Sequence, residues 1–449
     1  MASDPDHLRT AERRREQSLT PGVATARRET SARRFGYRWT IVALLFCATT
    51  ISYIDRQVLG ILAPTLQREL GWTEVQYADI VSWFSFAYGV GLLFAGRLLD
   101  RIGVRTGFSA AIVVWSVAAI ATARATTVGA FGMMRALLGL GESANFPASL
   151  KTVAEWFPKK ERALAVGVFN AGSNVGAIIA PIAVPWIAIT WGWRQAFVAT
   201  GALGFLWLIF WLAVYREPHG HPRLGAAELA HIRSDPPEST TAIPWMSLLR
   251  YRQTWAFAAG KAFTDPIWLF YLFWLPKFLD ARFNVKLTAL AAPIVAVYLT
   301  ADVGSVAGGW LSGHLIARGW SVNAARKSTM LIAALLIVPT AFAPFVDSEW
   351  VAVAVVAVAA AAHQWWSANL FTTVSDMFPR RAVASVVGIG GFVGAMSAMV
   401  FQRATGVVLE RTGGRYGFVF AICGAAYVVA LAAIQLLAPR LAAVESHLE

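Results

Sequence analysis

Long blocks of apolar residues, separated by short polar gaps, occupy most of this chain. Each block can supply the roughly 20 apolar residues that a helix needs to cross a bilayer. The predicted spans cover residues 39–64, 77–98, 106–123, 128–151, 163–188, 195–214, 253–279, 288–316, 328–345, 349–375, 383–408 and 417–438. The pattern therefore predicts an all-α membrane protein with twelve transmembrane helices.

Basic residues gather in the gap that follows each even-numbered span. They are Arg97, Arg101, Arg105, Lys159, Lys160, Arg162, Arg216, Arg223, Arg326, Lys327, Arg380 and Arg381. Because Lys and Arg in short loops favour the cytoplasmic side, both termini are expected on the cytoplasmic side of a bacterial inner membrane.

Two stretches of the chain repeat at one spacing. Residues 155–160 (EWFPKK) match residues 376–381 (DMFPRR), and 379 − 158 = 221. The stretch 194–197 (RQAF) matches 415–418 (RYGF), again at 415 − 194 = 221. A duplicated six-helix unit follows, and two bundles inserted in the same orientation are typical of transporters that rock around a central site.

The polar segments divide the chain around these bundles. We expect a disordered cytoplasmic tail at 1–37, an N-terminal bundle at 38–215, a cytoplasmic linker at 216–250, a C-terminal bundle at 251–440 and a short tail at 441–449. Residues 1–37 are Arg-rich without hydrophobic periodicity, so they cannot bury enough surface to fold alone.

Composition supports a membrane protein and excludes other classes. Hydrophobic residues make up 57% of the chain and charged residues 14%, against about 25% charged in soluble domains. The net charge of +13 lies in the gaps between apolar blocks and forms no basic face for nucleic acid. No zinc spacing, P-loop or nucleophile elbow occurs, so we expect no enzyme activity, no metal and no cofactor.

A few charged residues lie inside the predicted spans, where each costs about 2.5 to 3.5 kcal/mol to insert, so they are candidates for function. They are Asp55, Arg56, Arg135, Glu142, Lys261 and Asp265. Arg135 and Glu142 are two helical turns apart, and Asp55 or Arg56 could bridge them. Such a cluster either titrates during transport or stays permanently paired. Lys261 is either a substrate ligand or the intrahelical partner of Asp265.

The loop after the second span, residues 96–105 (GRLLDRIGVR), resembles the loop signature of the major facilitator superfamily. The resemblance implies a gate latch made of Gly96, Asp100, Arg101, Gly103 and Arg105. The alternative is that Asp100 and Arg101 only cap helix ends at the interface.

Three further stretches resemble the anion:cation symporters of that superfamily. They are residues 53–56 (YIDR), 135–147 (RALLGLGESANFP) and 155–162 (EWFPKKER). Within that family, residues 169–176 (FNAGSNVG), 265–268 (DPIW) and 362–367 (AHQWWS) are most like the bacterial hexuronate transporters. The resemblance implies that Asp55 and Glu142 carry protons. It also implies a substrate site made of Tyr53, Arg56, Tyr88, Arg135, Asn170, Lys261, His363, Gln364 and Ser367.

We therefore expect a monomeric secondary transporter that imports an organic anion, a hexuronate such as glucuronate or galacturonate, by alternating access. The coupling ion is a proton, with sodium as the alternative. The other candidate functions are proton-coupled transport of galactonate or glucarate, and export of small molecules. His363 is either a ligand or a neutral, satisfied hydrogen-bonding group.

Overall fold

The structure is a computed structural model that describes residues 36–234 and 245–444. Most of the predicted tail at 1–37, part of the linker and the last five residues lie outside the described residues. Within the described residues the chain is helical, with irregular connections.

The first half of the chain forms six of the expected spans. The helices are α3 (Arg38–Leu70), α4 (Glu74–Ile102), α5 (Val104–Thr122), α6 (Val128–Glu142), α7 (Asn145–Trp156), α8 (Lys159–Trp191) and α9 (Trp193–Val214). The fourth span is divided between α6 and α7. A connection with a short 3₁₀ turn, η1 (Pro218–Gly220), and the helices α10 (Ala226–Ile232) and α11 (Trp245–Leu248) leads to the second half.

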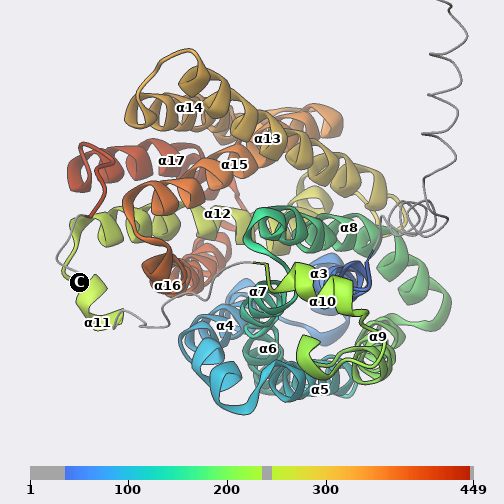
Figure 1. Cartoon of the computed structure of the whole chain (residues 1–449). Coiled ribbons are helices and arrows are strands. Elements are labelled where there is room, and N and C mark those ends of the chain that lie inside the picture. Colours follow the sequence, from blue (N-terminus) through green and yellow to red (C-terminus); the bar gives the residue numbers. More distant parts are fainter. Residues whose placement is uncertain (1–35, 235–244, 445–449) are drawn as a thin grey trace, which may run out of the picture.

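The second half repeats the arrangement. Its elements are α12 (Arg252–Phe283), α13 (Ala291–Ala317), α14 (Val322–Ile337), the 3₁₀ segment η2 (Val338–Phe345), α15 (Glu349–Met377), α16 (Arg380–Thr412) and α17 (Gly417–Leu437). Figure 1 shows the blue-to-green half and the yellow-to-red half side by side. The chain is thus an all-α fold of two six-helix bundles.

Ten helices of the described chain are long and apolar enough to cross a membrane. The other two expected spans coincide with the α6–α7 pair and with α12, which carries Lys261, Asp265 and Lys277. Charged and broken spans have a weaker apolar pattern than the rest, and these two contain four of the six charged candidates, Arg135, Glu142, Lys261 and Asp265.

Pro147 explains why the fourth span breaks. A proline inside a helix has no N–H to donate and its ring collides with the carbonyl of residue i−4, which here is Ser143. Helix α6 accordingly ends at Glu142, and α7 starts at Asn145. The break places the carboxylate of Glu142 at a helix end in the interior of the bundle.

The two bundles are joined at the end of the molecule that contains the turn between α3 and α4. Arg68 pairs with Asp280 at 3.3 Å, Arg403 pairs with Asp79 at 3.2 Å, and Lys277 pairs with Glu74. Each of these pairs joins one half to the other.

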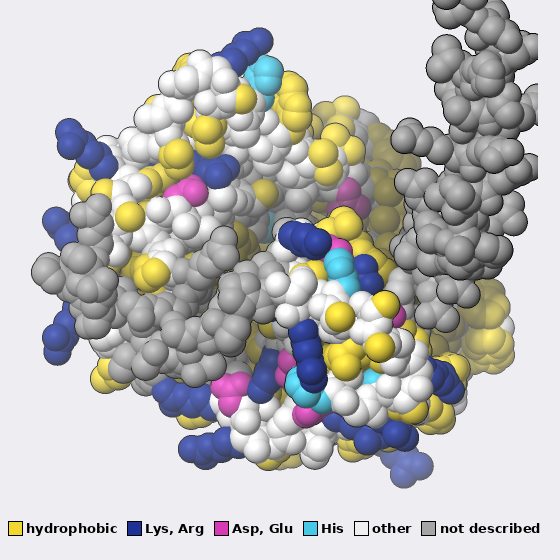
Figure 2. All heavy atoms as spheres, in the orientation of Figure 1, with side chains coloured by type: hydrophobic (Ala, Val, Ile, Leu, Met, Phe, Trp, Pro, Cys, Tyr) yellow, Lys and Arg dark blue, Asp and Glu magenta, His cyan; other side chains and the backbone are white. Residues whose placement is uncertain are grey.

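Ion pairs at the opposite end, where the described chain begins, stay within one half. Lys151 pairs with Asp100 at 2.7 Å and Arg326 with Asp376 at 3.1 Å. These two pairs therefore do not join the halves, in contrast to the three pairs at the first end. Lys and Arg side chains surround the face of α10 and α11 in Figure 2.

The connection between the halves packs onto the first bundle. The Glu228 carboxylate of α10 accepts hydrogen bonds from the backbone N–H groups of Tyr37 and Arg38 at 3.0 and 3.1 Å. The Arg38 side chain also pairs with Glu228 at 3.2 Å and with Glu161 at 3.1 Å. Since the first N–H groups of a helix have no partner inside it, Glu228 satisfies the start of α3. Helix α10 lies over this half in Figure 1.

Small residues allow the helices to pack closely around Glu142. A Cβ atom added at Gly139 would lie 2.5 Å from the Phe84 carbonyl oxygen and 3.1 Å from the Tyr88 nitrogen. Helices α4 and α6 therefore pack backbone to backbone, as small residues permit in membranes.

We predict that Gly139→Ala lowers the free energy of unfolding by about 1 to 3 kcal/mol, because the new methyl group meets backbone that must move. Gly129→Ala is the matched control on the same helix, since nothing lies within 4 Å of its Cβ position. Apparent unfolding temperatures of the purified proteins in detergent measure both effects. Equal temperatures for the two variants would contradict the close packing of α4 on α6.

Candidate functional site

A buried ion pair joins α3 to the end of α6. Arg56 donates from Nε to Glu142 Oε2 at 2.9 Å, and its Nη2 lies 2.8 Å from the same oxygen as an ion pair. Arg56 is 8% exposed and Glu142 1%. A charge-assisted hydrogen bond within a close ion pair makes this a strong contact, whereas either charge left alone would be costly to bury.

Aromatic rings surround the Arg56 guanidinium. Its Cζ atom lies 4.8 Å from the ring centre of Tyr53, 5.1 Å from Phe84 and 5.0 Å from Tyr88. Arginine stacks favourably on aromatic faces because its planar cation meets the negative ring face. Tyr53 and Tyr88 are only partly buried, so this cation lies beside the space between the halves.

Arg135 is placed differently from the sequence hypothesis. Its guanidinium donates to the backbone carbonyls of Asp55 and Arg56, at 3.4 and 3.0 Å, and it is 1% exposed. It also lies 5.9 Å from the ring of Phe273 in the second half. Of the two candidate bridges to Glu142, Arg56 is the one that pairs with this carboxylate.

The Asp55 carboxylate is buried, at 2% exposure, and neither of its oxygens has a hydrogen-bond partner among the described residues. Thr200 of α9 lies beside it, yet the two groups miss hydrogen-bond geometry, and the Thr200 hydroxyl is unpartnered too. An unpaired carboxylate is costly to bury in an apolar interior, which makes Asp55 a candidate for function. Sequence reasoning missed Thr200, because a threonine in an apolar span gives no charge signal.

Charged and polar side chains of the second half lie near Tyr53 of the first half. Lys261 Nζ pairs with Asp265 Oδ1 at 2.8 Å, one turn apart on α12. Tyr53 lies within electrostatic range of Lys261 and of Tyr298 on α13. Lys261 is thus the intrahelical partner of Asp265, and it also lies near Tyr53 of the first half.

His363 is held by two aromatic partners. Its ring stacks on Trp268 of α12 at 4.8 Å, and its Nδ1 is hydrogen-bonded to the Tyr427 hydroxyl of α17. Trp268 in turn contacts the Tyr298 ring at 5.8 Å. His363 is 5% exposed and has a polar partner, so the structure matches the satisfied hydrogen-bonding interpretation.

The remaining predicted substrate ligands are more exposed and lie on α8 and α15. Asn170 of α8 is exposed, while Gln364 and Ser367 of α15 are partly buried. Ser367 lies one turn beyond His363 on α15. One helix of each half, α8 and α15, therefore contributes these polar groups.

The comparisons with known proteins agree on one superfamily. Residues 45–402, most of the chain, match the profile described as Major Facilitator Superfamily. The chain belongs to the major facilitator superfamily. Members of this superfamily are transporters, and this chain is a transporter and not an enzyme.

Curated relatives within the superfamily are named for sugar acids. The chain is 33% identical over 385 residues to the "Hexuronate transporter" of Escherichia coli K12, covering 84% of this chain and 89% of that protein. It is 32% identical over 332 residues to the "Galacturonate transporter" of Dickeya chrysanthemi, covering 72% and 96%. The "D-galactonate transporter" of Escherichia coli O6:H1 is 28% identical over 413 residues, covering 88% and 93%.

A solved structure shares the fold. A bacterial homologue of the human lysosomal transporter Spinster, in an inward-facing and unoccupied conformation, superposes with a TM-score of 0.67. The match covers 90% of this chain and 96% of that one at 19% identity, which shows the fold alone.

The superfamily's loop signature lies at the end of the molecule opposite the ion pairs that join the halves. Asp100 is exposed and accepts from Lys151 Nζ, which also donates to the Leu99 carbonyl at 3.1 Å. Arg105 donates to the Leu212 carbonyl at 2.7 Å. Gly96 and Arg101 are exposed, and Gly103 has φ +78°, which favours glycine there.

Asp302 is a further acid that the sequence analysis missed. It lies in the middle of α13, one turn from Tyr298, and its Oδ1 is buried without a hydrogen-bond partner in the described chain. The sequence carried a signal for this residue, because a charged side chain inside the predicted span 288–316 is costly to insert into a membrane.

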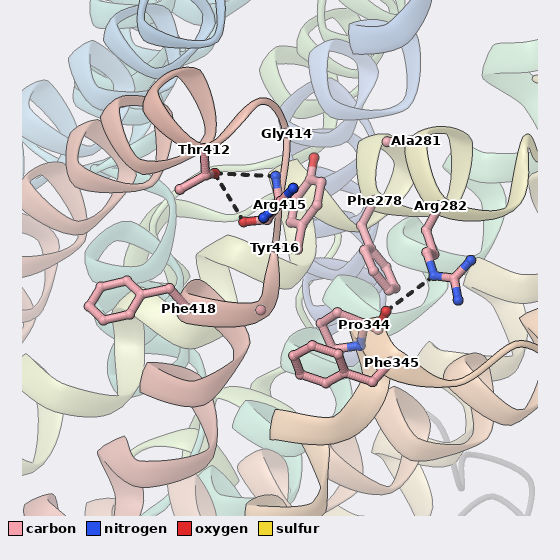
Figure 3. A pocket seen from close by; sticks show the side chains of 11 residues that line it. Phe278, Ala281, Arg282, Pro344, Phe345, Thr412, Gly414, Arg415, Tyr416 and Phe418 are labelled. Atoms are coloured by element: carbon pink, nitrogen blue, oxygen red, sulfur yellow. Dashed lines mark hydrogen bonds between the residues drawn. The ribbon is translucent and has the colours of Figure 1, made fainter.

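No group of three or more metal-ligating side chains occurs within residues 36–234 and 245–444. One cavity of about 570 Å³ lies away from the charged site, at the joined end of the second bundle. Figure 3 shows it between Phe278, Phe345, Tyr416 and Phe418, with Arg282 donating to the Pro344 carbonyl. Its lining contains none of the predicted site residues.

We predict that Tyr427→Phe destabilises the protein by about 1 to 3 kcal/mol, because it leaves the buried His363 Nδ1 without its partner. Tyr298→Phe is the control, since that ring contacts Trp268 and its hydroxyl forms no hydrogen bond among the described residues. Thermal unfolding in detergent compares the two. A loss in the control as large as in Tyr427→Phe would show that the hydrogen bond to His363 does not stabilise the fold.

Proposed function

We propose that this transporter imports a sugar acid, a hexuronate such as glucuronate or galacturonate, together with protons. The observation that carries the proposal is the buried Arg56–Glu142 pair beside two partly exposed tyrosines. If Glu142 takes up a proton, the pair loses its negative member and Arg56 is left to bind the carboxylate of an anion.

The rest of the site suits a polyhydroxylated anion. Lys261 supplies a second cation from the other half, and Tyr53 and Tyr88 offer hydroxyls next to Arg56. Polar groups from both bundles around a central site are what alternating access requires. The relatives named for hexuronate and galacturonate transport support the same choice of cargo.

Asp55 is proposed as a second proton carrier. Its carboxylate is buried and unpartnered in the described residues, and Arg135 binds the backbone carbonyl of the same residue. Gain or loss of a proton at Asp55 would change the local charge beside Arg135 and Glu142. The coupling ion is then a proton, with sodium the alternative.

The conformation fits one state of an alternating-access cycle. Ion pairs join the two bundles at the end away from the start of α3, and the Spinster homologue with this fold is inward-facing. With both termini in the cytoplasm, the open end would face inward. The loop of Gly96, Asp100, Arg101, Gly103 and Arg105 would then be a latch that engages the second bundle only in the opposite state.

Export of apolar compounds is the competing function. An exporter of this kind would favour an apolar cavity, whereas Arg56, Arg135 and Lys261 place cations there. The charge of the cargo distinguishes the two functions.

We predict that Glu142→Gln abolishes uphill uptake and leaves substrate counterflow, because the amide keeps the shape but cannot take up a proton. Asp55→Asn is expected to behave similarly. Uptake of labelled glucuronate into proteoliposomes under an imposed pH difference measures accumulation. Glu69→Gln, an acid partly exposed at the joined end, is the control and should accumulate substrate normally. Accumulation by Glu142→Gln against a gradient would exclude this residue as the coupling site.

We also predict that glucuronate or galacturonate is carried and the matching neutral hexose is not. A neutral sugar would leave the freed cation unpaired, which costs about 3 to 5 kcal/mol, a factor of hundreds to thousands in affinity. Competition of unlabelled glucose, glucuronate, galactonate and glucarate against labelled glucuronate measures this preference. Equal competition by glucose would refute the anion site, whereas stronger competition by galactonate would move the cargo to an open-chain acid.

A further inference from the structure

A groove runs along the outside of the molecule where the two bundles meet. It is about 640 Å³ in volume and lies between α4 and α16. Its walls are Asp79, Ser82, Trp83 and Phe86 of α4 and Met399, Val400, Arg403, Ala404, Val407 and Val408 of α16. Both helices are long and apolar enough to cross a membrane, so the groove opens toward lipid.

The floor of the groove is fixed by direct contacts between the halves. The Ser82 hydroxyl donates to the Met399 carbonyl at 3.1 Å. A Cβ atom at Gly406 would lie 2.4 Å from the Ala78 Cβ, so the two helices cross closely there. A molecule in this groove would contact both bundles at once.

The depth of the groove matches the boundary between headgroups and acyl chains. The 29 residues of α4 span about 43 Å, close to the full thickness of a bilayer with its headgroups. Asp79 is five residues, about 7.5 Å, from the start of this helix. Trp83 and Phe86 lie one to two turns deeper, where acyl chains begin.

The two parts of the groove differ in chemistry. The deeper part is apolar and open, with Trp83 51% and Val400 60% exposed. Trp83 is held in place, because its ring packs against Phe86 at 5.8 Å and lies over Gly132 of α6. The shallower part carries one cation and one anion, Arg403 and Asp79, whose side chains are 66% and 30% exposed.

Both side chains of this pair keep hydrogen-bonding groups that a further partner can use. Arg403 approaches Asp79 Oδ1 through Nη1 at 3.2 Å, and this buried oxygen forms no hydrogen bond of good geometry in the described chain. The exposed part of the Asp79 carboxylate, at 30% for the whole side chain, is therefore Oδ2, which is open to a further partner. A guanidinium has five donors and a carboxylate about four acceptor positions, so each group can bind a second partner of opposite charge. A zwitterionic phospholipid with a primary ammonium offers both, a phosphate for Arg403 and N–H donors for Asp79.

We propose that the groove binds one phosphatidylethanolamine molecule, with its headgroup on Arg403 and Asp79 and an acyl chain along Trp83, Phe86 and Val400. Because the lipid contacts both bundles at the joined end, its binding stabilises the conformation in which α4 and α16 lie together. A ligand shifts an equilibrium by its difference in affinity for the two states, so opening of this end must release or loosen the lipid.

The test is native mass spectrometry of the full chain in detergent with three lipids that carry the same acyl chains. Phosphatidylethanolamine should be retained as a single molecule. Phosphatidylcholine, which has the same charges but no N–H donor, should bind about tenfold more weakly. Phosphatidylglycerol, which has no ammonium, should also bind more weakly, because Asp79 would face it unpaired.

Variants locate the site. Asp79→Asn should bring phosphatidylethanolamine and phosphatidylcholine close to equal affinity, and Arg403→Gln should weaken both. Ala404→Phe fills the exposed groove without removing either charge and should also lose the lipid. Arg411→Gln, on the exposed last turn of the same helix, is the control and should retain it.

Two results would overturn the proposal. One is equal retention of phosphatidylethanolamine and phosphatidylcholine by the unaltered protein. The other is full retention of phosphatidylethanolamine by Ala404→Phe, since a folded protein with a filled groove has no room for the lipid there. Unfolding temperatures of each variant in the same detergent identify any that fail to fold.

Discussion

The interior of this protein depends on how a buried cation and anion are kept together in apolar surroundings. Arg56 and Glu142 lie on helices from distant parts of the sequence, so their pairing requires α3, α4 and α6 to pack without gaps. Gly139 makes that possible, because any side chain there would separate α6 from α4. Pro147 ends α6 at the required residue. Gly139 and Pro147 thus set the geometry of the ion pair, in which proton binding to Glu142 would free Arg56.

The sequence predicted the fold well because a bilayer imposes a simple rule. Backbone polar groups in lipid must be satisfied within each helix, so span positions follow from apolar length. The two predicted spans with the weakest apolar pattern coincide with the α6–α7 pair and with α12, which are not among the ten helices apolar enough to cross a membrane. The break in the fourth span was not predicted, although Pro147 carried the information.

The candidate site was predicted only in part. Charges inside spans pointed to Arg56, Glu142 and Lys261, but sequence cannot say which charge faces which. Arg135 illustrates this, because among the described residues its hydrogen bonds go to backbone carbonyls and not to a carboxylate. A pattern of residue types carries no information about backbone carbonyl partners. Thr200 was missed for the same reason, since its place beside Asp55 arises from the packing of α9 on α3 and not from periodicity.

The distribution of charge pairs suggests why the protein can change state. At the joined end, Arg68–Asp280 and Arg403–Asp79 cross between the halves with exposed arginines, so each pair contributes only about 0 to 1 kcal/mol, whereas Lys277, which pairs with Glu74 across the halves, is buried. Exposed pairs cost little to break, whereas the close packing of α4 on α16 must also separate when this end opens. The buried Arg56–Glu142 pair lies within one half and need not break when the halves separate. Rocking of the bundles and titration of the site can therefore be controlled by different interactions, and substrate that contacts both halves would couple them.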